Sequence, residues 1–121
     1  MTTGVLHIPL TAFSAYGSSL GVSAHNLANV LTPNFKPGRV TYAELPAQSG
    51  VAASISQPVS EKPTLTPGPG WGHREAVSRP SETDVAREMV NLITTSHAYK
   101  ANAKLVSTAD SMLGTVVDMA V

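Results

Sequence analysis

Two stripes of apolar and small residues with helical spacing flank a middle segment that is rich in proline. The first stripe alternates intervals of three and four residues and comprises Leu10, Phe13, Gly17, Leu20, Ala24, Leu27 and Leu31. The second alternates in the same way and comprises Val85, Met89, Leu92, Ser96, Tyr99, Ala103, Val106, Asp110, Leu113, Val117 and Ala120. Such heptad spacing is typical of a helix that packs lengthwise on another helix. The pattern therefore predicts one long helix near each end of the sequence.

Prolines indicate the limits of the first helix. Pro9 suits the first position of a helix, where the missing N–H costs nothing, so we expect the helix to begin there. Thr32 precedes Pro33 and is disfavoured in helical conformation, so the helix should end by Leu31. A helix of about 23 residues would span roughly 35 Å.

The second helix is expected to begin just after Pro80. Ser81 is a suitable N-cap, and Asp84 stands three residues later, as in a capping box. Residues 81–121 contain no proline, so a helix of about 38 residues would span roughly 57 Å. Because the first helix is shorter, part of the second stripe has no partner within the chain. This mismatch predicts assembly with other chains.

Two polar residues, Ser96 and Asp110, stand on the second stripe. In one interpretation the stripe shifts by one residue at these points and uses Thr95 and Ala109 instead. In the other, a polar stripe position fixes the register of the helix against its neighbours. The sequence leaves both interpretations open.

The middle segment predicts short strands joined by turns, since eight of the nine prolines lie between Pro33 and Pro80. Residues 39–45 and 51–55 alternate in part between apolar and polar side chains, which favours a small strand hairpin. Residues 67–70, Pro-Gly-Pro-Gly, indicate a turn and do not suit a central strand. We therefore expect a mainly α fold, in which two long terminal helices form an antiparallel, coiled-coil-like hairpin with a small β/loop insert. The expected parts are the N-terminal helix (1–36), the insert (37–80) and the C-terminal helix (81–121).

The composition argues against several classes of partner. Eight basic residues balance eight acidic ones, and 13% of residues are charged, compared with roughly a quarter in ordinary soluble domains. A net charge of zero provides no attraction for nucleic acid or an anionic membrane, and it favours self-association. No stretch approaches the roughly 18 apolar residues of a membrane span, and the N-terminus lacks the features of a cleaved signal peptide. We expect neither nucleic-acid binding nor membrane insertion.

Residues that could carry chemistry are few and scattered. The sequence has no cysteine, which excludes disulfides and thiolate sites. The histidines lack the helical spacing of a zinc site and stand apart, at His7, His25, His73 and His97. The mixed cluster His73-Arg74-Glu75 lies beside Trp71 in a segment rich in glycine and proline, where we expect a surface loop without the rigid surroundings that a site needs. The sequence predicts no catalytic, metal or cofactor site, and a protein that is not an enzyme.

Asn26 and Asn29 lie three residues apart near the end of the first predicted helix. Asparagine competes for backbone hydrogen bonds and is a poor residue for a helix interior. In one interpretation the helix simply frays toward Thr32 and Pro33. In the other, the two amides form a structural motif that bonds across the turn or to a neighbouring chain. Both interpretations stay open.

These residues resemble the N-terminal motif of flagellar basal-body rod and hook proteins. The similar segment is Ser23-Ala24-His25-Asn26-Leu27-Ala28-Asn29 followed by Thr32-Pro33-Asn34-Phe35-Lys36. In this N-terminal motif, Val30-Leu31 departs from the family pattern. Residues 84–93, 98–102 and 107–113 resemble the C-terminal helix of the same family, in which Ser96-His97 departs from the pattern. The resemblance covers both ends of the chain. Its motif residues are Asn26, Leu27, Asn29, Thr32, Phe35, Lys36, Glu88, Met89, Tyr99, Asn102 and Asp110.

The resemblance implies a structural subunit of the bacterial flagellum that serves motility. The short chain is most similar to the C-type proximal rod proteins, and another short rod component is the alternative within the family. Members of the family pack their terminal helices into an axial tube in the periplasm-spanning rod of the basal body. They are exported by the flagellar type III apparatus without a cleaved signal peptide. The implied partners are copies of the chain itself, other rod and axial proteins, and the export apparatus.

The stripe residues are the expected assembly interface. They comprise Leu10, Phe13, Leu20, Leu27, Val85, Met89, Leu92, Tyr99, Val106, Asp110, Leu113 and Val117. A second hypothesis, from another class, is a free-standing helical hairpin that binds a partner helix along its exposed stripe. An enzyme that uses His73 and Glu75 is a third hypothesis, which the criteria for a catalytic site disfavour.

Overall fold

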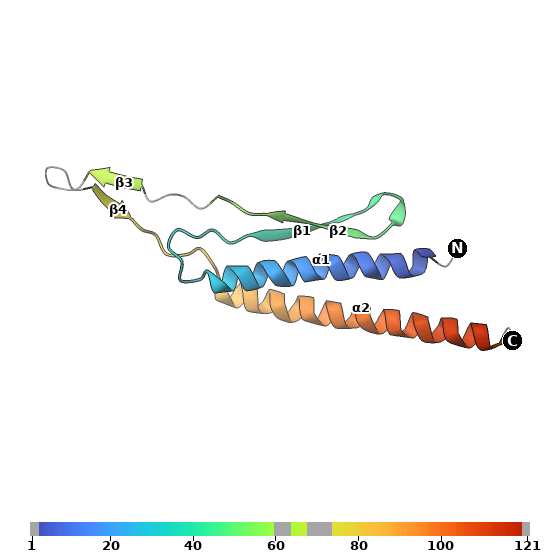
Figure 1. Cartoon of the computed structure of the whole chain (residues 1–121). Helices are drawn as coiled ribbons and strands as arrows, with labels where there is room; N and C mark the ends of the chain where they lie inside the picture. Colours follow the sequence, from blue (N-terminus) through green and yellow to red (C-terminus); the bar gives the residue numbers. More distant parts are fainter. Residues whose placement is uncertain (1–2, 60–63, 68–73, 120–121) are drawn as a thin grey trace.

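The computed structural model describes residues 3–59, 64–67 and 74–119 (Figure 1). Its elements, in chain order, are α1 (Thr3–Ala28), β1 (Arg39–Glu44), the 3-10 turn η1 (Pro46–Gln48), β2 (Val51–Ser56), β3 (Thr64–Pro67), β4 (Arg74–Val77) and α2 (Val85–Met119). The two helices run antiparallel, and α1 lies between α2 and the hairpin of β1 and β2 (Figure 1). The prediction of a mainly α fold with two terminal helices and a small antiparallel sheet between them is confirmed.

The middle position of α1 gives this helix two covered faces. Phe13 packs on Tyr99 of α2, with ring centroids 4.7 Å apart. On another face the ring of Tyr16 packs against that of Tyr42 of β1, with ring centroids 6.2 Å apart. The third face is exposed, and the sequence explains why it is not charged: residues 1–35 contain no aspartate, glutamate, lysine or arginine. The exposed face of α1 therefore carries no aspartate, glutamate, lysine or arginine side chain.

Helix α1 begins earlier than predicted, at Thr3, so that Pro9 lies inside it. An interior proline removes a helical hydrogen bond and costs about 3 kcal/mol or more in an isolated helix. Here Pro9 is buried, and its carbonyl accepts a hydrogen bond of 2.7 Å from the Nδ2 atom of Asn102 in α2. The prediction that Pro9 opens the helix was wrong, because the helix begins before it, at Thr3.

Helix α2 begins at Val85, and its N-cap is Asp84 rather than Ser81. The Oδ1 atom of Asp84 accepts a hydrogen bond of 3.2 Å from the backbone N–H of Arg87, which is the geometry of an N-cap. Ser81 instead accepts a bond from the N–H of Thr83, at 3.2 Å. Just before the helix, the N–H of Glu82 donates to the carbonyl of Phe35, at 3.1 Å. This hydrogen bond keeps the chain non-helical for three residues longer than predicted.

One face of α2 packs against α1 along most of the shorter helix. Glu88, Tyr99 and Asn102 contact α1 directly. Further positions with the same spacing, both between and after these three residues, are half-buried, namely Leu92, Thr95, Val106 and Ala109. This face differs from the predicted stripe at several places. Within the single chain Ala109 is half-buried and Asp110 is exposed, while Thr95 and Ser96 are both half-buried. Whether the polar stripe positions fix the register against neighbouring chains stays a prediction.

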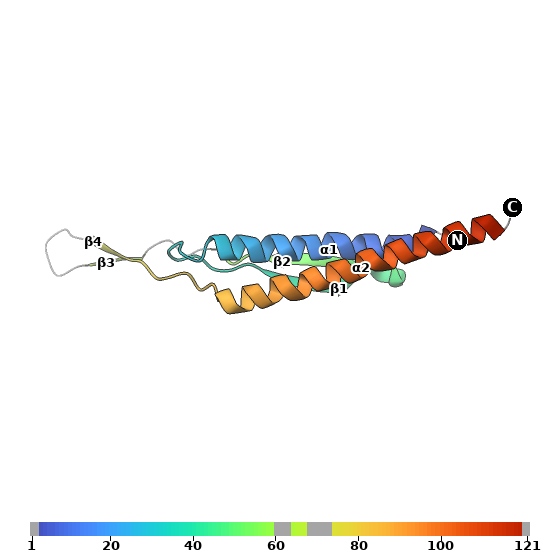
Figure 2. The ribbon, with the colours of Figure 1, turned by 90° about the horizontal axis from the view of Figure 1, so that it is seen from below.

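The helices differ in length as expected. Helix α1 has 26 residues and α2 has 35, which correspond to roughly 39 and 52 Å. Figure 2 shows α2 crossing α1 obliquely and continuing past its start. The C-terminal third of α2 consequently carries exposed apolar side chains, including Met112, Leu113, Val116, Val117 and Met119. Ala120, the last residue of the predicted stripe, lies outside the described residues.

The hairpin of β1 and β2 agrees with the predicted strands to within one residue. Its register pairs Arg39 with Ser56 and Glu44 with Val51. The loop between the strands docks on the start of α1: the Oγ1 atom of Thr11 accepts a bond from the N–H of Val51, at 3.1 Å, and lies directly against Gly50. Gly50 has a φ of 121°, a conformation that suits glycine.

The insert contains a second hairpin that the sequence did not predict. Strands β3 and β4 are antiparallel, with Thr64 opposite Val77 and Pro67 opposite Arg74. In Figure 1 this hairpin extends beyond the end of the molecule where α1 ends and α2 begins. Arg74 and Glu75 lie in β4 rather than in a loop, which corrects that prediction, whereas Trp71 and His73 lie outside the described residues. Pro67 ends a strand of a two-stranded sheet, where proline is tolerated.

Candidate assembly interface

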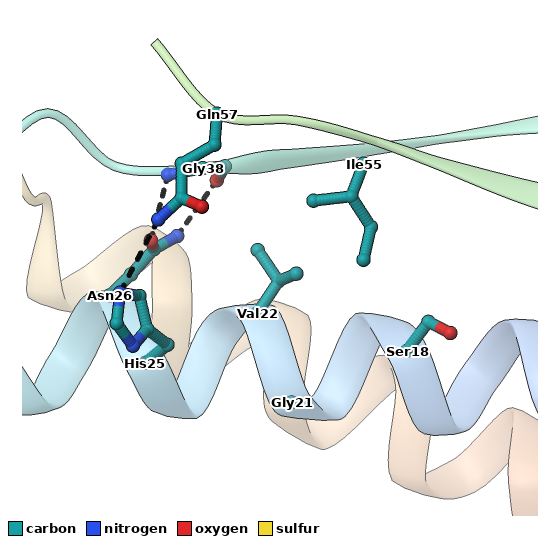
Figure 3. Close-up of a pocket in the computed structure, with 8 residues that line it drawn as sticks. All are labelled: Ser18, Gly21, Val22, His25, Asn26, Gly38, Ile55 and Gln57. Carbon is teal, nitrogen blue, oxygen red and sulfur yellow. Dashed lines mark hydrogen bonds between the residues drawn. The ribbon is translucent and has the colours of Figure 1, made fainter. Parts of the chain in front are cut away.

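A single asparagine joins three elements at the end of α1. Asn26 is 1% exposed. Its Nδ2 atom donates to the carbonyl of Gly38, at 2.8 Å, and its Oδ1 atom accepts from the N–H of Gly38, at 2.8 Å (Figure 3). The same Nδ2 atom donates to Oε1 of Glu88, at 3.0 Å. The side chain thus completes a backbone-like pair with the residue before β1 and holds the first turn of α2. Of the two interpretations of the asparagine pair, the structural motif is the one observed for Asn26.

The second asparagine of the pair closes the turn that comes after α1. The Nδ2 atom of Asn29 donates to the carbonyl of His25, at 2.9 Å, and its Oδ1 atom accepts from the hydroxyl of Thr32, at 3.1 Å. The ring of His25 packs edge-on against Phe35, with centroids 5.6 Å apart, and Phe35 is 7% exposed. The turn is therefore fixed by its own side chains.

The residues after this turn contact the segment that precedes α2. Asn34 has a φ of 57°, and its N–H and Oδ1 atom bond to the carbonyl and N–H of Arg79, at 2.8 and 3.0 Å. Lys36 is half-buried. These contacts, together with those of Asn26, place the first turn of α2 beside the last turn of α1.

The predicted interface residues fall into two groups. Phe13, Leu20, Leu27, Leu92 and Val106 are half-buried, and lie where α1 and α2 cover one another. The others are exposed, comprising Leu10, Val85, Met89, Tyr99, Asp110, Leu113 and Val117, although Tyr99 still contacts Phe13. The role of either group in contacts between chains stays a prediction.

Sequence reasoning missed a second stripe on α1, which lies on its exposed face. Its residues are small and have heptad spacing: Ser14, Gly17, Gly21, Ala24 and Ala28, all exposed. A side-chain carbon added at Gly17 or Gly21 would meet nothing within 4 Å. The signal was present in the sequence, because these small residues interleave with the larger Phe13, Leu20 and Leu27, but the predicted stripe mixed the two sets.

Grooves and polar clusters in the described residues lack the features of a catalytic centre. The larger groove, of about 370 Å³, lies between α1 and β2 and is lined mainly by apolar surface, including Val22 and Ile55 (Figure 3). At one end Gln57 reaches His25, with 3.4 Å between their Nε2 atoms. Within the described residues, no group of three or more histidine, aspartate or glutamate side chains could hold a metal ion. In the same part of the chain, no helix has the length and apolar character of a membrane span.

Comparisons with known proteins agree with this architecture. Residues 81–119 match the family model for the C-terminal region of flagellar basal body rod FlgEFG proteins. The flagellar basal-body rod protein FlgC of Yersinia enterocolitica and that of Salmonella typhimurium are each 31% identical to this chain, over 90% of both chains. The rod protein FlgG of Buchnera aphidicola is 29% identical over 91% of this chain but only 47% of its own length. The resemblance drawn from the sequence motifs is confirmed, and the chain belongs to the flagellar basal-body rod protein family.

Proposed function

We propose that this chain is a structural subunit of the flagellar basal-body rod, and that it assembles through the faces of α1 and α2 that the single chain leaves open. The observation that carries the proposal is the C-terminal third of α2, which extends past the start of α1 (Figure 2). Its exposed apolar residues include Leu113, 41% exposed, and Val117, 61% exposed. Burying such a side chain contributes about 1.5–3 kcal/mol, a gain that arises only when another chain covers the helix.

The exposed stripe of α1 supports the same proposal. A glycine within a helix costs about 1 kcal/mol relative to alanine, and among the described residues nothing lies close enough to Gly17 or Gly21 to require a small side chain. Small residues let helix backbones approach closely. We infer that this stripe receives a helix of a neighbouring subunit.

The rest of the proposal comes from membership of the family. The partners are other rod components and further copies of the chain, and the location is the rod of the basal body. Export by the flagellar apparatus without a cleaved signal peptide, and the absence of catalysis, nucleic-acid binding and membrane insertion, belong to the same proposal. Buried polar contacts such as those of Asn26 suit a subunit whose fold must be fixed before its apolar faces meet neighbours.

A pair of substitutions at Gly17 tests the proposed interface in a strain that lacks the native gene. Gly17→Leu fills the exposed stripe and improves helix propensity, so the isolated chain should be at least as stable as wild type. We expect it to be depleted from purified basal bodies and the cells to lose swimming. The matched control Gly17→Ala keeps the residue small and should assemble normally. Normal swimming of both variants would contradict a helix contact at this stripe.

A further inference from the structure

A second groove, of about 330 Å³, lies where α1, β1 and the first half of α2 meet. About half of its lining surface is polar, and the polar residues include Ser19, Ser23, Asn91, Thr94 and Thr95. Four consecutive residues of β1, 39–42, also line it. Because alternate side chains of a strand point to opposite faces, a run of consecutive residues means that the groove runs along the strand's edge. In the described residues β1 pairs only with β2, so this edge is open.

Glu88 lies in the wall of this groove and is 7% exposed. Its Oε1 atom accepts the hydrogen bond from Asn26, at 3.0 Å. Within the described part of the chain, every fully buried side-chain nitrogen or oxygen has a hydrogen-bond partner. The second carboxylate oxygen, for which the structure gives no such bond, is therefore at the surface of the groove.

Glu88 stands in the first turn of α2, where the helix dipole favours a negative charge, and the one side chain that hydrogen-bonds to it, Asn26, is neutral. A buried charge is costly when its partners are neutral, and Asn26 offers only an amide dipole. The described residues form no ion pair with Glu88; Arg39 lines the same groove but its side chain is exposed. Ca²⁺ takes about six to eight oxygen ligands, whereas this groove has one carboxylate among hydroxyls and amides, and the described residues contain no group of three or more histidine, aspartate or glutamate side chains that could hold a metal ion. A lysine or arginine side chain matches both the charge and the surrounding acceptors.

We propose that a lysine or arginine side chain of a neighbouring rod subunit enters this groove and pairs with Glu88. The neighbouring segment lies along the open edge of β1, where unpaired backbone groups accept a second chain. The inference rests on the proposed function, because it requires assembly with other subunits. It adds a polar contact with a defined charge to the apolar contacts of the helix faces.

The substitution Glu88→Gln tests the pairing in a strain that produces the variant as the sole copy. Glutamine keeps an oxygen that can accept from Asn26, so the thermal unfolding midpoint of the purified variant should equal that of wild type. Without the negative charge, we expect at least a tenfold decrease of the chain in purified basal bodies. The control Glu82→Gln removes a carboxylate that is exposed and outside the groove, and it should assemble as wild type does. A photo-crosslinking residue at Asn91 should then join the chain to a neighbour's peptide that contains lysine or arginine.

Three results would overturn the inference. Equal amounts of Glu88→Gln and wild type in basal bodies would mean that the charge is not used between chains. If the unfolding midpoint of Glu88→Gln falls far enough to explain its depletion from basal bodies, Glu88 serves the fold alone. If Arg39→Gln shows the same assembly defect and no crosslink to a neighbour forms, the cation that pairs with Glu88 is Arg39 of the same chain. If the wild-type chain itself is absent from basal bodies, the proposed function fails as well, which separates the two proposals.

Discussion

The two ends of α2 are held in different ways. At the start, Glu88 bonds to α1, Asp84 caps the helix and Glu82 bonds to the turn after α1. At the far end, from Leu113 to Met119, every side chain is exposed. The first end is fixed within the chain by polar contacts, whereas the second end presents apolar surface to the outside.

This difference reverses the usual arrangement of a globular domain. Among the described residues, the buried hydrophobic side chains are Pro9, Ala15 and Phe35, while Ser23, Asn26 and Glu88 are buried polar residues. Directional hydrogen bonds join the elements of the single chain, and many of its large apolar side chains are exposed. In such a protein, stability and assembly can be changed separately.

The largest expected effect on stability comes from removing the polar contacts at the start of α2. Asn26→Ala leaves Glu88 and both backbone groups of Gly38 without their partner, at about 1–3 kcal/mol for each unsatisfied group. We expect a loss of roughly 3–5 kcal/mol in the free energy of unfolding, measured by urea denaturation. Asn29→Ala removes only local bonds at the turn and serves as the control, with an expected loss of about 1 kcal/mol. Similar losses for the two variants would contradict the central role of Asn26.

A smaller effect is expected where the hairpin loop docks on α1. In Gly50→Ala the new methyl group falls on Thr11 Oγ1, and the φ of 121° is unfavourable for alanine. We expect a loss of about 1–3 kcal/mol. When Gly50→Ala is combined with Thr11→Ala, the steric part of this loss should disappear, because the two residues are in contact. A double-mutant cycle measures this coupling. Additive losses would mean that only the backbone conformation matters.

The smallest effect on stability, with the largest on assembly, is expected at the far end of α2. Deleting residues 113–121 removes side chains that are exposed throughout the described part of this segment. The free energy of unfolding of the isolated chain should change by less than about 0.5 kcal/mol, as for surface changes in general, while swimming is lost. Normal swimming would show that the exposed apolar end is not used. A large loss of stability would show that the two ends of α2 are not as different as the structure indicates.

The sequence predicted the helices well but not the faces they use. The stripe through Met89 and Asp110 is regular in sequence, yet Glu88 and Ala109 are the residues turned toward α1. The reason is that a helix with apolar residues on several sides, as α2 has at Val90 and Ile93 as well as Met89, permits more than one stripe. Choosing between them requires the position of the partner helix.

Local rules also failed where a distant residue intervened. Pro9 and Ser81 each carry a strong signal for a helix start, and neither begins a helix. Asn102 supports Pro9 from α2, and Phe35 holds the segment after Ser81. The second hairpin was missed because its strands have only four residues each, which is too short for an alternating pattern to emerge.

The sequence by itself determined the two terminal helices, their unequal lengths, the proline-rich insert and the family motifs, because spacing, prolines and motif residues act within a few positions of one another. The tertiary structure alone decided which faces are covered, where Pro9 and Asp84 stand in their helices, and that Asn26 bonds to Gly38 and Glu88. The bonds of Asn26 join groups 12 and 62 residues apart in sequence, and the bond of Asn102 to Pro9 joins groups 93 residues apart. A hydrogen bond exists only when the fold brings donor and acceptor within about 3 Å of one another, and no local pattern specifies that approach.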